Sequence, residues 1–128
     1  MTRILAAGLG CRRGCAGEEI AGLVRLALAE AGLVEGELTG LFTPAFKHDE
    51  AGLAEAAGLL RVPLVLLPDA ALKEAEPRAL TRSERVVALT GLGSVAEAAA
   101  LAGAGARSRL LRARIASAHA TCALAVGE

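Results

Sequence analysis

Two adjacent arginines stand in a glycine-rich segment near the start of the chain. The segment Gly8–Gly14 reads GLGCRRG and contains Arg12 and Arg13. Guanidinium groups bind carboxylates through paired hydrogen bonds, and the segment joins a predicted strand to a helix N-terminus, where free backbone N–H groups favour anions. It matches neither the dinucleotide fingerprint, whose third glycine would be Arg13, nor a P-loop. We predict an anion site, or alternatively a tight turn with solvated arginines; the candidate ligand-binding residues are Gly8, Gly10, Cys11, Arg12, Arg13 and Gly14.

A second charged segment, KHDE at residues 47–50, occupies another predicted junction between a strand and a helix. Lys47 could bind a ligand carboxylate, and Glu50 is a candidate acid or base. The alternative is an ordinary helix N-terminus, whose dipole favours acidic residues such as Asp49 and Glu50.

The segment GLGSVAE, residues 91–97, is a third glycine turn that leads into a helix. Ser94 can cap that helix, and Glu97 stands at the capping-box spacing from it. The helix end is again a potential anion site, with Gly91 and Ser94 as contributors. Glu97 is a second candidate catalytic residue, although capping alone would account for it.

The three cysteines, Cys11, Cys15 and Cys122, form no CxxC pair and fit a reducing compartment. A thiol near a helix N-terminus can be reactive, but small buried residues are the simpler interpretation. The sequence has no cluster of metal ligands, so no metal site is predicted. Arginines predominate near the C-terminus, where Arg112 and Arg114 would share one face of a regular strand.

Hydrophobic periodicity predicts the elements that position these residues. Strands and helices alternate over most of the chain, and the last part is typical of a hairpin joined near residues 116–118. This order predicts a single-domain three-layer α/β/α sandwich over residues 1–128, with a mixed sheet of about five strands. The expected strands are 3–7, 38–46, 62–67 and two within 109–126; the expected helices are 18–31, 49–60, a turn at 69–74, 83–89 and 95–102.

Composition excludes several classes of protein. The chain of 128 residues is 54% hydrophobic and 22% charged with a formal net charge of +0, which excludes intrinsic disorder. Neutral charge and 2% aromatic content argue against nucleic-acid binding. We expect no membrane span, no signal peptide and a cytoplasmic location.

Taken together, these segments resemble the CobE family of cobalamin biosynthesis, which is homologous to the C-terminal domain of CbiG. The resemblance covers almost the whole chain. The residues that carry it are GLGCRRG at 8–14 with Glu18-Glu19, Lys47 with Glu50 and Gly52-Leu53, Ser83-Glu84, GLGSVAEAAAL at 91–101, and HATCALAV at 119–126.

This resemblance implies a role in building the corrin ring, with a precorrin or corrinoid intermediate as the ligand and no other cofactor evident. Corrin precursors are apolar in the middle and fringed with carboxylates. Arg12, Arg13, Lys47 and Arg114 could bind those carboxylates if they converge on one edge of the sheet. We therefore expect a carrier or accessory factor. The alternatives are a CbiG-like hydrolase that opens a precorrin lactone and releases acetaldehyde, with Glu97 or Glu50 as acid or base, or a docking partner of another cobalamin-biosynthesis enzyme.

Overall fold

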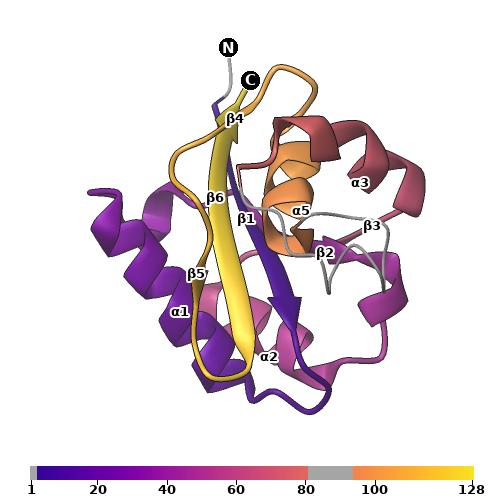
Figure 1. Ribbon diagram of the computed structural model, residues 1–128. Helices are drawn as coiled ribbons and strands as arrows, with labels where there is room; N and C mark the ends of the chain where they lie inside the picture. Colours follow the sequence, from indigo (N-terminus) through magenta and orange to yellow (C-terminus); the bar gives the residue numbers. More distant parts are fainter. Residues whose placement is uncertain (1–2, 81–93) are drawn as a thin grey trace.

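The computed structural model describes residues 3–80 and 94–128. Strands and helices alternate along most of this part of the chain (Figure 1). Short 3-10 turns follow α1, β2 and α3 at Glu35–Glu37, Ala45–Lys47 and Glu76–Arg78. The regular elements are β1 (Ile4–Cys11), α1 (Gly17–Glu30), β2 (Gly40–Pro44), α2 (Ala51–Leu60), β3 (Leu64–Leu67), α3 (Asp69–Ala75), α5 (Val95–Ala104), β4 (Arg109–Leu110), β5 (Ile115–Ala116) and β6 (Ala120–Gly127).

The described strands form one mixed sheet in the order β3-β2-β1-β6-β4, with β5 also paired to β6. Strands β1, β2 and β3 run parallel, and β6 is antiparallel to β1, with Ala7 opposite both Leu41 and Leu124. The carboxyl ends of the three parallel strands therefore lie at one edge, and the start of β6 lies there too, because Cys11 pairs with Ala120.

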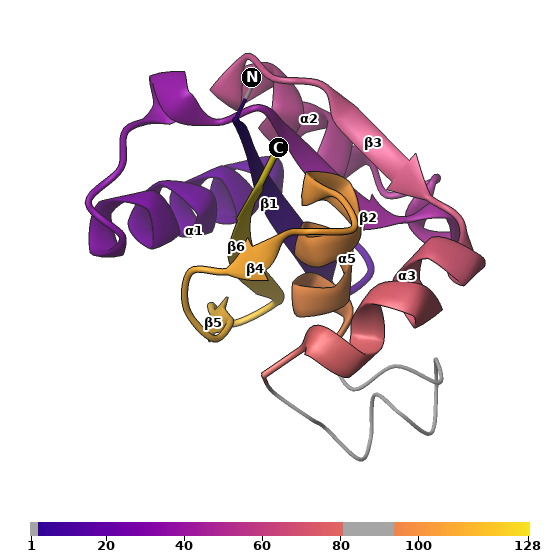
Figure 2. The ribbon, with the colours of Figure 1, turned by 90° about the horizontal axis from the view of Figure 1, so that it is seen from above.

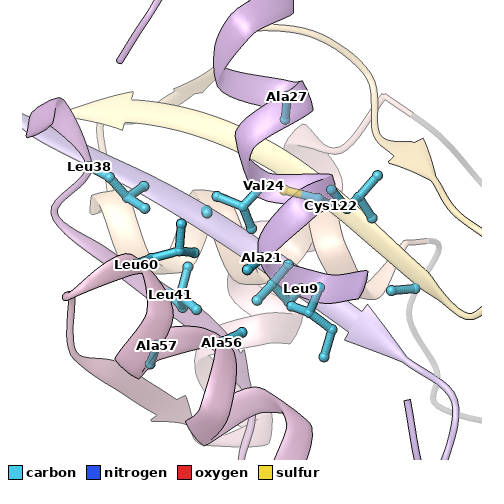
Figure 3. Close-up of a cluster of buried hydrophobic side chains, with 14 of the residues drawn as sticks. Leu9, Ala21, Val24, Ala27, Leu38, Leu41, Ala56, Ala57, Leu60 and Cys122 are labelled. Atoms are coloured by element: carbon cyan, nitrogen blue, oxygen red, sulfur yellow. The ribbon is translucent and has the colours of Figure 1, made fainter. Parts of the chain in front are cut away.

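Helices cover both faces of the sheet, as Figure 2 shows, so the predicted α/β/α sandwich is confirmed. On one face, Leu9 packs against α1 and α2 in the cluster drawn in Figure 3. On the other face, Ala6 belongs to a second cluster in which α5 packs on β1 and α3 packs on α5. Alternate residues of β1 belong to the two clusters because successive side chains of a strand point to opposite faces of the sheet.

The helices form largely where periodicity predicts them. In α1 the buried residues recur at helical spacing and face the sheet: Ile20, Leu23, Val24, Ala27 and Leu28. In α5 the buried residues are mostly alanines, which let the helix lie very close to the sheet. A Cβ on Gly8 would stand 2.0 Å from the carbonyl oxygen of Ala96.

Several predicted boundaries change in the structure. Strand β1 continues to Cys11, so Gly8 and Gly10 belong to a strand instead of a loop, because β6 pairs with β1 over its whole length. Three strands replace the predicted two in the last part of the chain: the short strands β4 and β5 and the long strand β6. The described residues therefore form a sheet of six strands. Residues 111–114 are not a regular strand, and Arg112 turns to α1, where it donates to the carbonyl oxygen of Glu30. The predicted helix 83–89 lies outside the described residues.

The predicted hairpin is confirmed: β5 and β6 pair, and the N–H of Ser117 donates to the carbonyl oxygen of Ala120 across the turn. Within residues 3–80 and 94–128, no helix is long and apolar enough to cross a membrane.

Candidate functional site

An open cavity of about 570 Å³ lies at the edge of the sheet where the parallel strands end. Four parts of the chain meet there: the end of β1, the turn after β2, the N-terminus of α5, and the β5–β6 hairpin together with the residue that precedes it. This volume falls within the range of small-molecule sites, and the position is the usual one for ligands of α/β sheets. The lining comprises Gly10, Cys11, Arg12, Phe46, Lys47, Val95, Arg114 and Ala116–Thr121.

Three cationic residues from three separate segments line this cavity: Arg12, Lys47 and Arg114. The Lys47 ammonium donates to the carbonyl oxygen of Cys11 at 2.7 Å, which holds it at the end of β1 and uses one of its three N–H donors. The backbone N–H of Arg12 donates to the carbonyl oxygen of His119 at 2.8 Å, which ties the loop after β1 to the β5–β6 turn. Of the four basic residues that the sequence suggested for one edge of the sheet, Arg12, Lys47 and Arg114 line this cavity, whereas Arg13 does not.

Arg114 is held in place by Glu97, which the sequence suggested as a catalytic residue. The Glu97 side chain is fully buried and does not line the cavity. Its two carboxylate oxygens accept hydrogen bonds from the backbone N–H groups of Leu80 and Arg114, each at 2.8 Å. The predicted N-cap is confirmed, since the Ser94 hydroxyl accepts from the Glu97 N–H. Ser94 is buried and has this structural role, and Glu97 positions the chain at Arg114.

The loop after β1 separates the two neighbouring arginines. Arg13 and Gly14 line a second hollow of about 530 Å³ between this loop and the start of α2. Glu50, the other suggested catalytic residue, also lies in that hollow, where its carboxylate accepts from the Gly14 N–H at 3.0 Å. The loop packs tightly on α2, because a Cβ on Gly52 would stand 2.0 Å from the carbonyl oxygen of Cys15. Arg13, Gly14 and Glu50 are thus apart from the cavity that Arg12 lines.

Two glycines of the predicted site have other positions. Gly8 is buried under α5 and does not line the cavity, whereas Gly10 does. Gly91 lies outside the described residues.

Sequence reasoning missed a cluster of polar side chains that joins α1 to the β5–β6 turn. The Glu19 carboxylate accepts from the Ser117 hydroxyl, from the His119 backbone N–H at 2.8 Å, and contacts His119 Nδ1 at 2.9 Å. The Ser117 hydrogen bond and then the two His119 contacts lower the pKa of Glu19 to about 2. Ser117 and His119 line the cavity. In the sequence, Glu19 looks like an ordinary acidic residue in the first turn of a helix. Its partner His119 is about 100 residues away, so no local pattern links the two.

The thiols are poorly suited to nucleophilic chemistry. Burial raises the pKa of Cys11, which lines the cavity, and Lys47 offsets this only in part. Burial, followed by the charge of Glu19, raises the pKa of Cys15 to about 11, and burial alone raises that of Cys122 to about 12. A thiolate, the reactive form, is therefore scarce at neutral pH. Among the described residues no group of three His, Cys, Asp or Glu side chains could hold a metal ion.

Comparison with known proteins defines the class. The model of the protein family described as "Cobalamin synthesis G C-terminus" matches residues 5–125, so the chain belongs to this family, the C-terminal domain family of CbiG, and is a cobalamin biosynthesis protein. The sequence is 40% identical over 121 residues to Protein CobE of Sinorhizobium sp, covering 94% of this chain and 79% of that protein.

Similarity to solved structures supports the same family assignment. A crystal structure of CobE, from the cobalamin (vitamin B12) biosynthetic pathway, matches with a TM-score of 0.92 and 42% identity over 98% of this chain and 92% of that one. Cobalamin biosynthesis protein chiG from Agrobacterium tumefaciens str. C58 matches with a TM-score of 0.76 and 38% identity over 95% and 97% of the two chains. The predicted resemblance to the CobE family is confirmed.

Proposed function

We propose that this protein carries a corrin-ring intermediate and that the cavity at the carboxyl end of the sheet holds one carboxylate-fringed edge of it. The observation that carries the proposal is the convergence of Arg12, Lys47 and Arg114 on one cavity. These side chains come from segments far apart in the sequence.

The cavity combines the two properties that a corrin acid requires. Its cations can bind peripheral carboxylates through charge-assisted hydrogen bonds. Phe46, Val95 and alanines of the β5–β6 turn supply apolar surface for the macrocycle. The cavity is open, so a macrocycle larger than 570 Å³ can rest on it with part of its surface in solvent or against an enzyme.

Adjacent arginines offer a matched test. Arg12 lines the cavity, whereas Arg13 lines the second hollow, and both are exposed. The purified protein is titrated with a metal-free corrin heptacarboxylic acid by visible absorbance and calorimetry. We expect saturable binding without chemical change of the ligand. Arg12→Ala should weaken binding by about tenfold, the worth of one lost charge-assisted contact, and Arg13→Ala by less than about twofold.

Either of two results would overturn the proposal: no binding by the wild-type protein, or equal losses in the two variants. Failure of free-ligand binding together with a stable complex with another cobalamin-biosynthesis enzyme would favour the docking function.

A hydrolase is the second candidate function, and the contact of Glu19 with His119 at the cavity favours it. A carboxylate that holds one ring nitrogen of a histidine leaves the other available as a general base. Glu97 is unsuited to that role because it is buried beside main-chain N–H groups. A spectrum that keeps changing at substoichiometric protein, with release of acetaldehyde from a corrin lactone, would establish hydrolysis and displace the carrier function.

A further inference from the structure

His119 stands on the rim of the cavity with its ring oriented by a carboxylate. Its side chain is 56% exposed, and Nδ1 lies 2.9 Å from Glu19 Oε1. The backbone on either side is tied down as well, because the His119 N–H donates to Glu19 and its carbonyl oxygen accepts from the Arg12 N–H. In the part of the chain that the structure describes, the ring forms its hydrogen bond and ion pair through Nδ1, and Nε2 forms neither.

This arrangement is more than is needed to close a β-turn. The Ser117 hydroxyl and the His119 N–H already join Glu19 to the turn. The additional contact at Nδ1 selects the tautomer in which Nδ1 carries the proton and Nε2 carries the lone pair. Histidines that bind metals almost always donate their other ring N–H to a carboxylate or carbonyl in this way.

A lone histidine cannot form a resident metal site, and the described residues supply no further ligands in a cluster. One nitrogen ligand is sufficient, however, for a metal that arrives already bound by four nitrogens of a macrocycle. The cations Arg12, Lys47 and Arg114 on the same cavity would bind the carboxylates of that macrocycle.

We propose that His119 Nε2 binds the cobalt ion of a metallated corrin as an axial ligand, with Glu19 as the positioning residue. This inference rests on the proposed corrin-binding function and specifies a metallated form of the ligand. The step is a ligand exchange: the Nε2 lone pair forms a bond to cobalt, one coordinated water leaves, and the oxidation state of cobalt does not change.

The experiment compares two probes, a metal-free corrin heptacarboxylic acid and its diaquocobalt(III) complex, on the full chain. We expect a shift in the visible spectrum of the cobalt complex that saturates at one equivalent of protein. With the cobalt(II) form of the same corrin, electron paramagnetic resonance should show a triplet splitting from one coordinated ¹⁴N. Labelling histidine with ¹⁵N should convert the triplet to a doublet, which excludes a lysine ligand.

The chain contains two histidines, so His48 supplies a matched control. His48 is exposed and lines neither of the two hollows at this edge of the sheet. His119→Ala should lose the spectral shift and the splitting and should weaken binding of the cobalt complex much more than binding of the metal-free acid, whereas His48→Ala should behave as wild type with both probes. Glu19→Gln should weaken binding of the cobalt complex by about tenfold, the lower end of the range for loss of an outer carboxylate.

The outcomes separate the two proposals. If the metal-free acid binds but the cobalt complex keeps both waters, axial ligation is wrong and the carrier function stands. Equal weakening of both probes by His119→Ala also overturns ligation, because it shows a role in folding or charge alone. Failure of both probes to bind the wild-type protein overturns both proposals.

Discussion

Gly8 sets the distance between α5 and the sheet, and replacing it with alanine should be severely destabilising. The added Cβ would lie 2.0 Å from the Ala96 carbonyl oxygen and 2.3 Å from the Ala100 nitrogen, both main-chain atoms. Ordinary contact begins at 3.4 Å, so α5 would have to move by about 1.4 Å. Overpacking a core costs about 1–3 kcal/mol, and a clash with backbone belongs at the upper end, so we expect a loss of about 3 kcal/mol.

Thermal and urea denaturation measure this loss. For a chain of this size, 3 kcal/mol corresponds to a decrease in Tm of roughly 10 °C. Gly10→Ala is the control on the same strand, because its Cβ would meet the Thr121 side chain first, at 2.9 Å, and a side chain can turn away. That variant should lose less than about 1 kcal/mol.

The displacement also reaches the cavity, since Val95 at the start of α5 lines it. Gly8→Ala should therefore weaken corrin binding even below its melting temperature. A Gly8→Ala protein as stable as Gly10→Ala would refute the close helix–sheet packing on which this reasoning depends.

Three further predictions concern the charged and thiol groups. Glu97→Gln should destabilise the protein by about 2 kcal/mol in urea denaturation. The Glu97 carboxylate accepts from the main-chain N–H groups of Leu80 and Arg114, and in the variant one of these two would face the amide N–H of glutamine. Unchanged stability with lost turnover would instead indicate a catalytic role. The pKa of Glu19 is lowered from 4.5 to about 2, so the contribution of its carboxylate to stability is complete above pH 4.5 and is lost as the pH falls toward 2. The urea midpoint should therefore fall more steeply below pH 4.5 for wild type than for Glu19→Gln. Parallel curves of urea midpoint against pH would contradict this. Cys11, which is partly exposed in the cavity, should react with a thiol reagent much faster than the buried Cys122, and bound corrin should slow the reaction of Cys11. Equal reaction rates of Cys11 and Cys122 would contradict the difference in exposure between the two thiols.

The alternation of elements was predictable because each leaves a local signal. The α1 stripe from Ile20 to Leu28 repeats at helical spacing and is buried as a unit. Ser94 has the residue type and spacing of an N-cap and forms that contact. Because parallel strands end at one edge of a sheet, the position of Lys47 and the loop after β1 at that edge also followed from the sequence.

Three features depended on contacts between distant segments. The strand β1 extends through Gly8 and Gly10 because β6, more than 100 residues later, pairs with it there. Glu97 looks like a capping-box acid, yet its carboxylate holds the backbone at Arg114, which a helical pattern cannot show. The pair of Glu19 and His119 has no local signature at all.

By itself the sequence determined the sandwich, its element types and the positive, glycine-rich edge, because periodicity and capping act over a few residues. The tertiary structure decided which charges share a cavity. Arg12 and Arg13 are neighbours in sequence but line different hollows, since one turn of the loop after β1 directs them apart. Arg114 and His119 join Arg12 only because β6 runs back along β1 and brings its turn to the same edge.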